Sequence, residues 1–249
     1  MNSSDRFAAQ VEERVTGRGE TLERLIEAYG GEDCWRSARQ IEAKVWAWGL
    51  AFALKLQAPM RAVEVEVAVR RPFVTMRPPR WRGIVGILDG QSCRLQDAEG
   101  RVIAERDDPR SRFPYGRRAL WWDRLDQVYF SGYALWNYLA FPAILMRSDV
   151  ECDELAPGLL EVRFPEELPT HSARQRLHVD HATGRLRRLD YTAEVFGSWA
   201  RAANVVLEHA RWEGLAYPCR RRVTPRGFGD RPWRAPLLVG IEISGWRLS

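Results

Sequence analysis

Residues 61–69 read Arg-Ala-Val-Glu-Val-Glu-Val-Ala-Val, with a valine at every odd position from Val63 to Val69. Glutamate or alanine occupies the positions between these valines. Because successive side chains of a strand point to opposite faces, the alternation predicts a strand with one buried and one solvated face. The surrounding sequence decides what kind of sheet this strand joins.

Strand signals continue on both sides of this stretch. Asp89-Gly90 and Ala98-Glu99-Gly100 are turn signals, and they predict short strands joined as a meander up to about Arg106. On the N-terminal side, residues 40–57 place large apolar side chains at even positions, which predicts one long strand that can be covered on both faces. These even positions are Trp46, Trp48, Leu50, Phe52, Leu54 and Leu56.

Two stretches have the spacing of helices instead. Apolar residues at helical intervals predict an N-terminal helix over about residues 7–29, broken near Gly17. A second helical stretch is expected over about residues 118–146, and Pro142 should kink or end it. One apolar face of this stretch contains Trp121, Leu125, Val128, Tyr129, Gly132, Tyr133, Trp136 and Leu139.

Beyond Val150 the chain returns to alternating strands. They are expected near residues 151–155, 159–164, 174–181, 185–196, 203–213, 216–224 and 237–247. Strands, then a helical insertion, then strands again is not the βαβ alternation of a parallel sheet. We therefore expect an α+β fold in which a curved antiparallel sheet wraps around a helical layer, as a single domain over residues 1–249.

The composition supports a folded domain that needs no cofactor. The chain has 249 residues, 45% of them hydrophobic, and 11 tryptophans, which is enough apolar surface to fold without disulfides or metal. Its cysteines lie far apart, with no Cys-x-x-Cys pair and no histidine at ligand spacing, so neither a zinc site nor a redox motif is predicted. The cysteines are Cys34, Cys93, Cys152 and Cys219.

Location and partners are predicted from charge and apolar stretches. Residues 1–10 are polar and lack the apolar core of a secretory signal, so we expect a cytoplasmic protein. The longest apolar stretch, residues 134–146, is shorter than the roughly 20 residues that cross a bilayer. The net charge of +5 comes almost wholly from arginine, and it is weak support for nucleic-acid binding. Peripheral membrane contact stays open, and the sequence does not predict an oligomeric state.

Two segments carry a resemblance to a known family. They are residues 25–35, Leu-Ile-Glu-Ala-Tyr-Gly-Gly-Glu-Asp-Cys-Trp, and the late run of residues 189–194 followed by 212–220, Trp-Glu-Gly-Leu-Ala-Tyr-Pro-Cys-Arg. Both resemble the lipoprotein-carrier superfamily that includes LolA and LolB. The resemblance implies an incomplete antiparallel barrel, closed by helices around an apolar cavity that receives acyl chains.

Aromatic residues of the predicted strand and helix are candidates for lining such a cavity. Large aromatic side chains suit an apolar pocket, and the hydroxyl of tyrosine or the N–H of tryptophan can orient a ligand. Packing in an ordinary core explains them equally well. The candidate ligand-binding residues are Trp46, Trp48, Phe52, Tyr129, Tyr133 and Trp136.

Three ionisable residues are candidates for acid–base catalysis. Asp190 and Glu194 share one face of a predicted strand, and they become a general acid and base if that face is concave. A solvated ladder paired with arginines is the alternative. His171 lies in a predicted loop, where an imidazole would be accessible, although most loop histidines are simply solvated. No His-Glu-x-x-His motif occurs, so no metal is expected.

These observations favour a protein that binds a hydrophobic small molecule, such as an acyl chain, polyketide or terpenoid, in a half-barrel cavity. The alternative is a cofactor-independent cyclase or isomerase that acts on a hydrophobic intermediate in the same cavity. An ionisable group that points into the cavity would favour the enzyme. A third possibility is a partner-binding domain without a cavity. The Gly-x-Ser-x-Gly, P-loop and Rossmann motifs are absent from the sequence.

Overall fold

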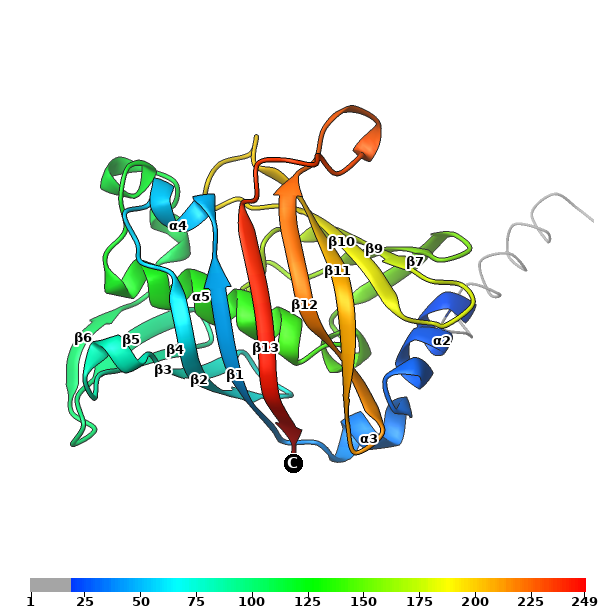
Figure 1. The fold of residues 1–249 in the computed structure, drawn as a ribbon, viewed down its shortest axis with the longest axis horizontal. Helices are drawn as coiled ribbons and strands as arrows, with labels where there is room; N and C mark the ends of the chain where they lie inside the picture. The colour runs from blue at the N-terminus through cyan, green and yellow to red at the C-terminus, as the bar shows by residue number, and fades with distance from the viewer. Residues whose placement is uncertain (1–18) are drawn as a thin grey trace, which may run out of the picture.

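The fold was analysed in a computed structural model that describes residues 19–249 (Figure 1). The part of the predicted N-terminal helix before residue 19, with the expected break near Gly17, lies outside the described residues. The rest of it forms α2 (Glu20–Ala28). Gly30 then adopts φ 109°, a left-handed conformation that favours glycine, and α3 (Gly31–Ser37) follows.

Within residues 19–249, thirteen strands form one antiparallel sheet in the order β6-β5-β4-β3-β2-β1-β13-β12-β11-β10-β9-β8-β7. The first half of the chain supplies β1 (Gln40–Trp48), β2 (Met60–Ala68), β3 (Phe73–Arg77), β4 (Val85–Asp89), β5 (Ser92–Gln96) and β6 (Val102–Arg106). The second half supplies β7 (Glu151–Ala156), β8 (Leu159–Arg163), β9 (Arg174–Val179), β10 (Leu186–Thr192), β11 (Arg201–Trp212), β12 (Leu215–Pro225) and β13 (Val239–Leu248). The two meanders join where β1 pairs with β13.

The sheet is curved and does not close, and α5 (Arg124–Leu139) lies across its concave side (Figure 1). A curved antiparallel sheet around a helix confirms the predicted α+β class. One further short helix, α4 (Leu50–Leu54), follows β1. Single 3₁₀ turns occur at Pro79–Trp81, Arg110–Arg112, Gly116–Ala119, Ala143–Met146 and Phe228–Asp230.

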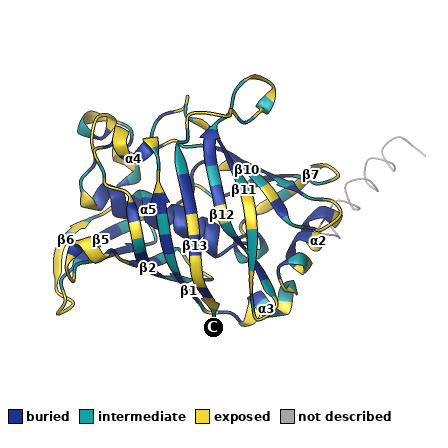
Figure 2. Cartoon of the chain, viewed as in Figure 1, coloured by how far each residue is buried: buried dark blue, intermediate teal, exposed yellow. Residues whose placement is uncertain are grey.

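Helix α5 is the centre of the core. Every residue of it except Arg124 and Phe130 is buried (Figure 2). The valines that alternate along β2 pack beneath it, with Val63 and Val67 fully buried, so the predicted one-sided burial of that strand is confirmed. No helix among residues 19–249 has the length and apolar character needed to span a membrane.

The helix begins later than the sequence predicted because its N-terminus is defined by two carboxylates. Asp123 and Asp126 form a capping box, in which each side chain accepts a hydrogen bond from the other residue's backbone N–H. Asp126 is fully buried and accepts hydrogen bonds from Arg117 at 2.6 Å and Arg118 at 2.8 Å, and it also pairs with Arg106. This charge-assisted network fixes the position of the first turn.

The prediction of one long strand over residues 40–57 was wrong after Trp48. Gly49 adopts φ 133°, and a Cβ there would lie 2.4 Å from the backbone oxygen of Leu238. The chain turns at this glycine into α4. Only one face of β1 is fully buried, and not both as expected, because its odd-numbered residues face the core. The core-facing residues are Ile41, Ala43, Val45 and Ala47.

Gly132 allows α5 to approach the sheet closely. A Cβ at Gly132 would lie 2.7 Å from Cβ of Leu88 on β4, so the helix can sit this near only with glycine there. Helix propensity alone predicts that Gly132→Ala stabilises the protein by about 1 kcal/mol. We expect instead a loss of about 1–3 kcal/mol in the free energy of unfolding, because the helix must move outward. Urea denaturation measures the sign, and an unchanged or higher stability would contradict the close packing.

Candidate functional site

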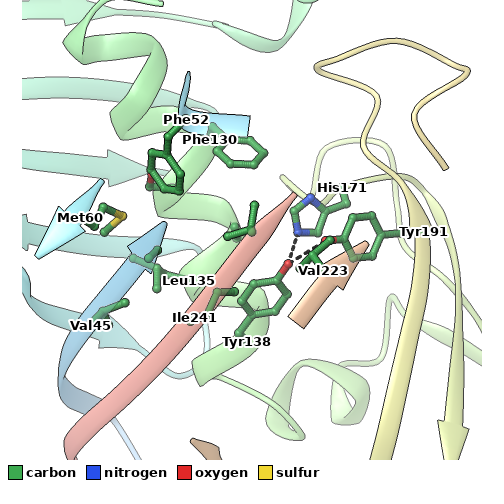
Figure 3. Close-up of a pocket in the computed structure, with 14 residues that line it drawn as sticks. Val45, Phe52, Met60, Phe130, Leu135, Tyr138, His171, Tyr191, Val223 and Ile241 are labelled. Carbon is green, nitrogen blue, oxygen red and sulfur yellow. Dashed lines mark hydrogen bonds between the residues drawn. The ribbon is translucent and has the colours of Figure 1, made fainter. Parts of the chain in front are cut away.

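An apolar cavity lies between α5 and the concave face of the sheet (Figure 3). Its walls come from β1 and α4, from the start of β2, from the middle of α5, and from β12 and β13. Most of the lining is aliphatic or aromatic, and the cavity has a volume of about 40 Å³. The apolar lining includes Val45, Phe52, Met60, Phe130, Leu135, Val223 and Ile241.

The cavity is one of a row of small spaces along α5. At about 40 Å³ it has room for about three water molecules, whereas pockets for small-molecule ligands usually exceed about 300 Å³. Two neighbouring spaces of about 10 Å³ share Ser131 with it, and one of them also shares Phe52 and Phe130. A further space of about 20 Å³ meets it at Tyr138. A few side chains therefore separate these spaces.

One end of the cavity is polar, where Tyr138, His171 and Tyr191 meet (Figure 3). The Tyr138 hydroxyl lies 2.7 Å from Nε2 of His171 and 3.0 Å from the Tyr191 hydroxyl. The rings of His171 and Tyr191 are stacked, with their centroids 3.9 Å apart. These three residues come from α5, the loop before β9, and β10, so the fold brings together parts of the chain that are distant in sequence.

His171 is held in its neutral form. Burial lowers its pKa to about 3, and the positive charge of Arg110 acts in the same direction. Its Nδ1 atom is buried without a hydrogen-bond partner in the described part of the chain. Burial also raises the pKa values of Tyr138 and Tyr191, so both hydroxyls keep their protons. At neutral pH the polar end of the cavity therefore offers hydrogen bonds and no charge of its own.

A buried cation lies on the other side of Tyr138. Arg221 on β12 is 2% exposed, and its guanidinium carbon lies 4.9 Å from the centroid of the Tyr138 ring. Arg221 lines the small space of about 20 Å³ that meets the cavity at Tyr138. Asn204 on β11 is fully buried, and a side-chain hydrogen bond from it lowers the pKa of the Tyr138 hydroxyl.

Of the ligand-binding residues predicted from the sequence, only Phe52 lines the cavity. Trp46 and Trp48 lie on the outer face of β1, because the core-facing positions of that strand are the odd ones. Trp136 is buried against β2, where its Nε1 donates to the backbone oxygen of Ala68 at 3.0 Å. Tyr129 packs against Phe113, with ring centroids 5.9 Å apart, in the core.

Tyr133, the remaining aromatic candidate, lies just behind the polar end. Its ring contacts that of His171 edge-on at 5.1 Å, and its buried hydroxyl has no hydrogen-bond partner in the described chain. It does not line the cavity itself. Tyr133 therefore supports the orientation of His171 from the helix side.

The three catalytic candidates do not meet in the cavity. His171 lines the cavity, but it is 1% exposed and not accessible as the loop prediction implied. Asp190 points away from the cavity because its neighbour Tyr191 points into it. Its carboxylate is buried on the other face, 2.9 Å from both His178 Nε2 and the Arg188 guanidinium.

Glu194 lies beyond the end of β10, exposed, and pairs with Arg110. Neither carboxylate therefore reaches the cavity where an acid–base pair would act. Among the described residues there is also no group of three or more His, Cys, Asp or Glu side chains arranged to hold a metal ion.

Tyr191 and Arg221 are site residues that the sequence analysis missed. The signal for Tyr191 was present, since it alternates with Asp190 and must face the opposite side of the strand. Arg221 is the middle of three consecutive arginines, and alternation requires one or two of them to point inward. No local pattern shows which face is concave, because β11 and β13 decide it.

No family model and no curated protein matches the chain. Solved structures with a similar fold include a DUF1329 family protein from Desulfovibrio piger, with 14% identity, 91% of each chain covered and a TM-score of 0.49. A LolA superfamily protein from Nitrosomonas europaea has 11% identity, 92% coverage of each chain and a TM-score of 0.49. Each of these likenesses concerns the fold alone.

The Tyr138 hydroxyl is the group that connects the polar end. Tyr138→Phe removes it and leaves Nε2 of His171 and the Tyr191 hydroxyl buried without this partner. We expect the free energy of unfolding to fall by about 1–3 kcal/mol. Tyr115→Phe is the matched control, since Tyr115 is 72% exposed, and it should change stability by less than about 0.5 kcal/mol. Equal effects in the two variants would refute the role given to this hydroxyl.

Proposed function

We propose that the protein binds a hydrophobic small molecule, such as an acyl chain, polyketide or terpenoid, in the cavity beside α5. One observation carries the proposal: the cavity has apolar walls and a small polar group at one end, in Tyr138, His171 and Tyr191. Ligand sites commonly combine these two features, with apolar walls for affinity and a few polar atoms for orientation. An ordinary core has no need for a buried histidine with an unsatisfied ring nitrogen.

The ligand must widen the cavity as it enters, because about 40 Å³ cannot hold an acyl chain. Phe52 and Phe130 separate the main space from its neighbour, so movement of these two rings joins the spaces. Phe52 lies on α4, a helix of five residues with exposed apolar side chains around it, which include Leu50 and Leu54. So short an element has few contacts to lose when it shifts.

A second candidate is the cofactor-independent cyclase or isomerase. The observation that favours it is the presence of His171, an ionisable group, in the cavity wall. With a pKa of about 3, His171 is a weak proton acceptor at neutral pH, which favours binding over acid–base chemistry. Incubation with linear isoprenoid and polyketide substrates tests the enzyme hypothesis. We expect no product whose formation is lost in the His171→Ala variant when that variant still binds the substrate. Such a product would establish catalysis.

Filling the cavity tests the binding proposal. Ala134 on α5 lines the cavity, and Ala134→Leu would occupy most of its volume while keeping a good helix former. We expect the variant to bind the fluorescent probe N-phenyl-1-naphthylamine at least tenfold more weakly than the wild-type protein. Fluorescence titration measures the dissociation constant.

Two further variants complete this test. Ala182→Leu, at an exposed turn, adds the same side chain away from the cavity and should leave probe binding unchanged. Phe52→Ala removes a ring between two spaces and should strengthen binding, since enlarged apolar cavities accept apolar ligands. Probe binding that is insensitive to both Ala134→Leu and Phe52→Ala would place the probe elsewhere and contradict the proposal.

A further inference from the structure

Arg221 differs from Arg220, the preceding residue of β12, in having no acidic partner. Arg220 points outward, where it forms ion pairs with Glu208 at 2.5 Å and with Glu242 at 4.0 Å. Arg221 points inward and is 2% exposed. Among the ion pairs of residues 19–249, none includes Arg221. Its Nε and Nη1 atoms are buried and have no hydrogen-bond partner in this part of the chain.

The surroundings of Arg221 contain neutral polar groups only. Tyr138 presents its ring face to the guanidinium, which is a favourable but partial compensation. Burial lowers the pKa of Arg221. The nearby ionisable side chains that act in the opposite direction are Tyr138, Tyr29, Tyr191 and Cys219. A guanidinium nevertheless keeps its proton inside proteins. The cation therefore remains, without an anion beside it.

Another buried arginine of this chain shows the usual arrangement. Arg118 is 9% exposed, and its Nε donates to the carboxylate of Asp126 at 2.8 Å. Buried charges are normally paired in this way, because transfer of an unpaired ion out of water is strongly unfavourable. Arg221 is more buried than Arg118 and lacks such a pair, so its environment is incomplete without an added anion.

The space beside Arg221 is separated from the apolar cavity by Tyr138. Arg221 lines a space of about 20 Å³ together with Asn137 and Gln175, and this space meets the larger cavity at Tyr138. Asn204 is fully buried, and its side chain lies near enough to the Tyr138 hydroxyl for a side-chain hydrogen bond to lower the pKa of that hydroxyl. Unsatisfied donors thus lie next to the polar end of an apolar cavity.

We propose that the ligand of this protein is an amphipathic carboxylic acid, whose carboxylate binds Arg221 and whose apolar chain fills the cavity beside α5. This inference rests on the proposed function and specifies the class of ligand. A carboxylate matches the planar fork of the guanidinium, which can donate two parallel hydrogen bonds to it. The amide of Asn204 and the hydroxyl of Tyr138 supply further donors. The Tyr138 ring must move aside to join the two spaces.

A comparison of two probes with the same chain tests the inference. Decanoate and decan-1-ol differ only in the head group, and isothermal titration calorimetry gives the dissociation constant of each at pH 7.5. We expect the wild-type protein to bind decanoate at least tenfold more tightly than decan-1-ol. This preference requires no variant, so it remains measurable whatever a substitution does to folding.

Two arginine variants then locate the effect. Arg221→Met keeps the length of the side chain and removes the charge, and it should weaken decanoate binding at least tenfold while changing decan-1-ol binding by less than twofold. Arg222→Met, the next residue on the opposite face of β12, should change neither. We also expect Arg221→Met without ligand to melt no lower than the wild-type protein, because the substitution removes an unpaired buried charge.

The outcomes separate this inference from the proposed function. If wild-type protein binds both probes equally, or if Arg221→Met leaves the preference for decanoate intact, the carboxylate assignment is wrong and the apolar binding site stands. If neither probe binds, both proposals fail. If Arg221→Met melts well below the wild-type protein without ligand, Arg221 is a structural residue that the chain itself satisfies, and the inference is overturned.

Discussion

The close contact between α5 and the concave face of the sheet is the constraint on which the rest of the structure depends. A sheet of thirteen strands that curves without closing leaves an apolar face that must be covered. Helix α5 covers this face. It packs closely against the sheet because Gly132 has no side chain and lets the helix backbone approach Leu88. The arginine network around Asp126 fixes the N-terminal end of the same helix.

The cavity follows from this geometry. A straight helix cannot follow a curved sheet along its whole length, so tight packing against β4 is accompanied by looser packing toward β12 and β13. Phe52, Phe130 and Tyr138 partly fill the gap, and small spaces remain between them. Interiors packed to normal density contain few such voids. A row of them along one helix face is therefore a feature of this particular arrangement of layers.

Much of the fold could be predicted from the sequence, because strand period and turn residues are local signals. The seven strands after Val150 lie close to the expected ranges, and the meander up to Arg106 is confirmed. The site was harder to predict. Trp46 and Trp48 were candidates for the cavity because large aromatic side chains suit an apolar pocket, but pairing with β13 turns the odd-numbered residues of β1 toward the core. Burial on the two faces depends on partners that are distant in sequence, and local periodicity does not contain that information.

The buried charged groups of this core differ in their effect on stability. Asp126 pairs with three arginines, so its burial holds a helix terminus in place. Arg221 has no such partner within residues 19–249, and an apolar residue of similar volume would fit its place with less desolvation. A protein that keeps a lone buried cation beside an apolar space loses stability in the empty state. An anionic ligand restores this stability when it binds, and a neutral ligand does not. The unpaired cation therefore makes the protein select a carboxylic acid over a neutral molecule with the same alkyl chain.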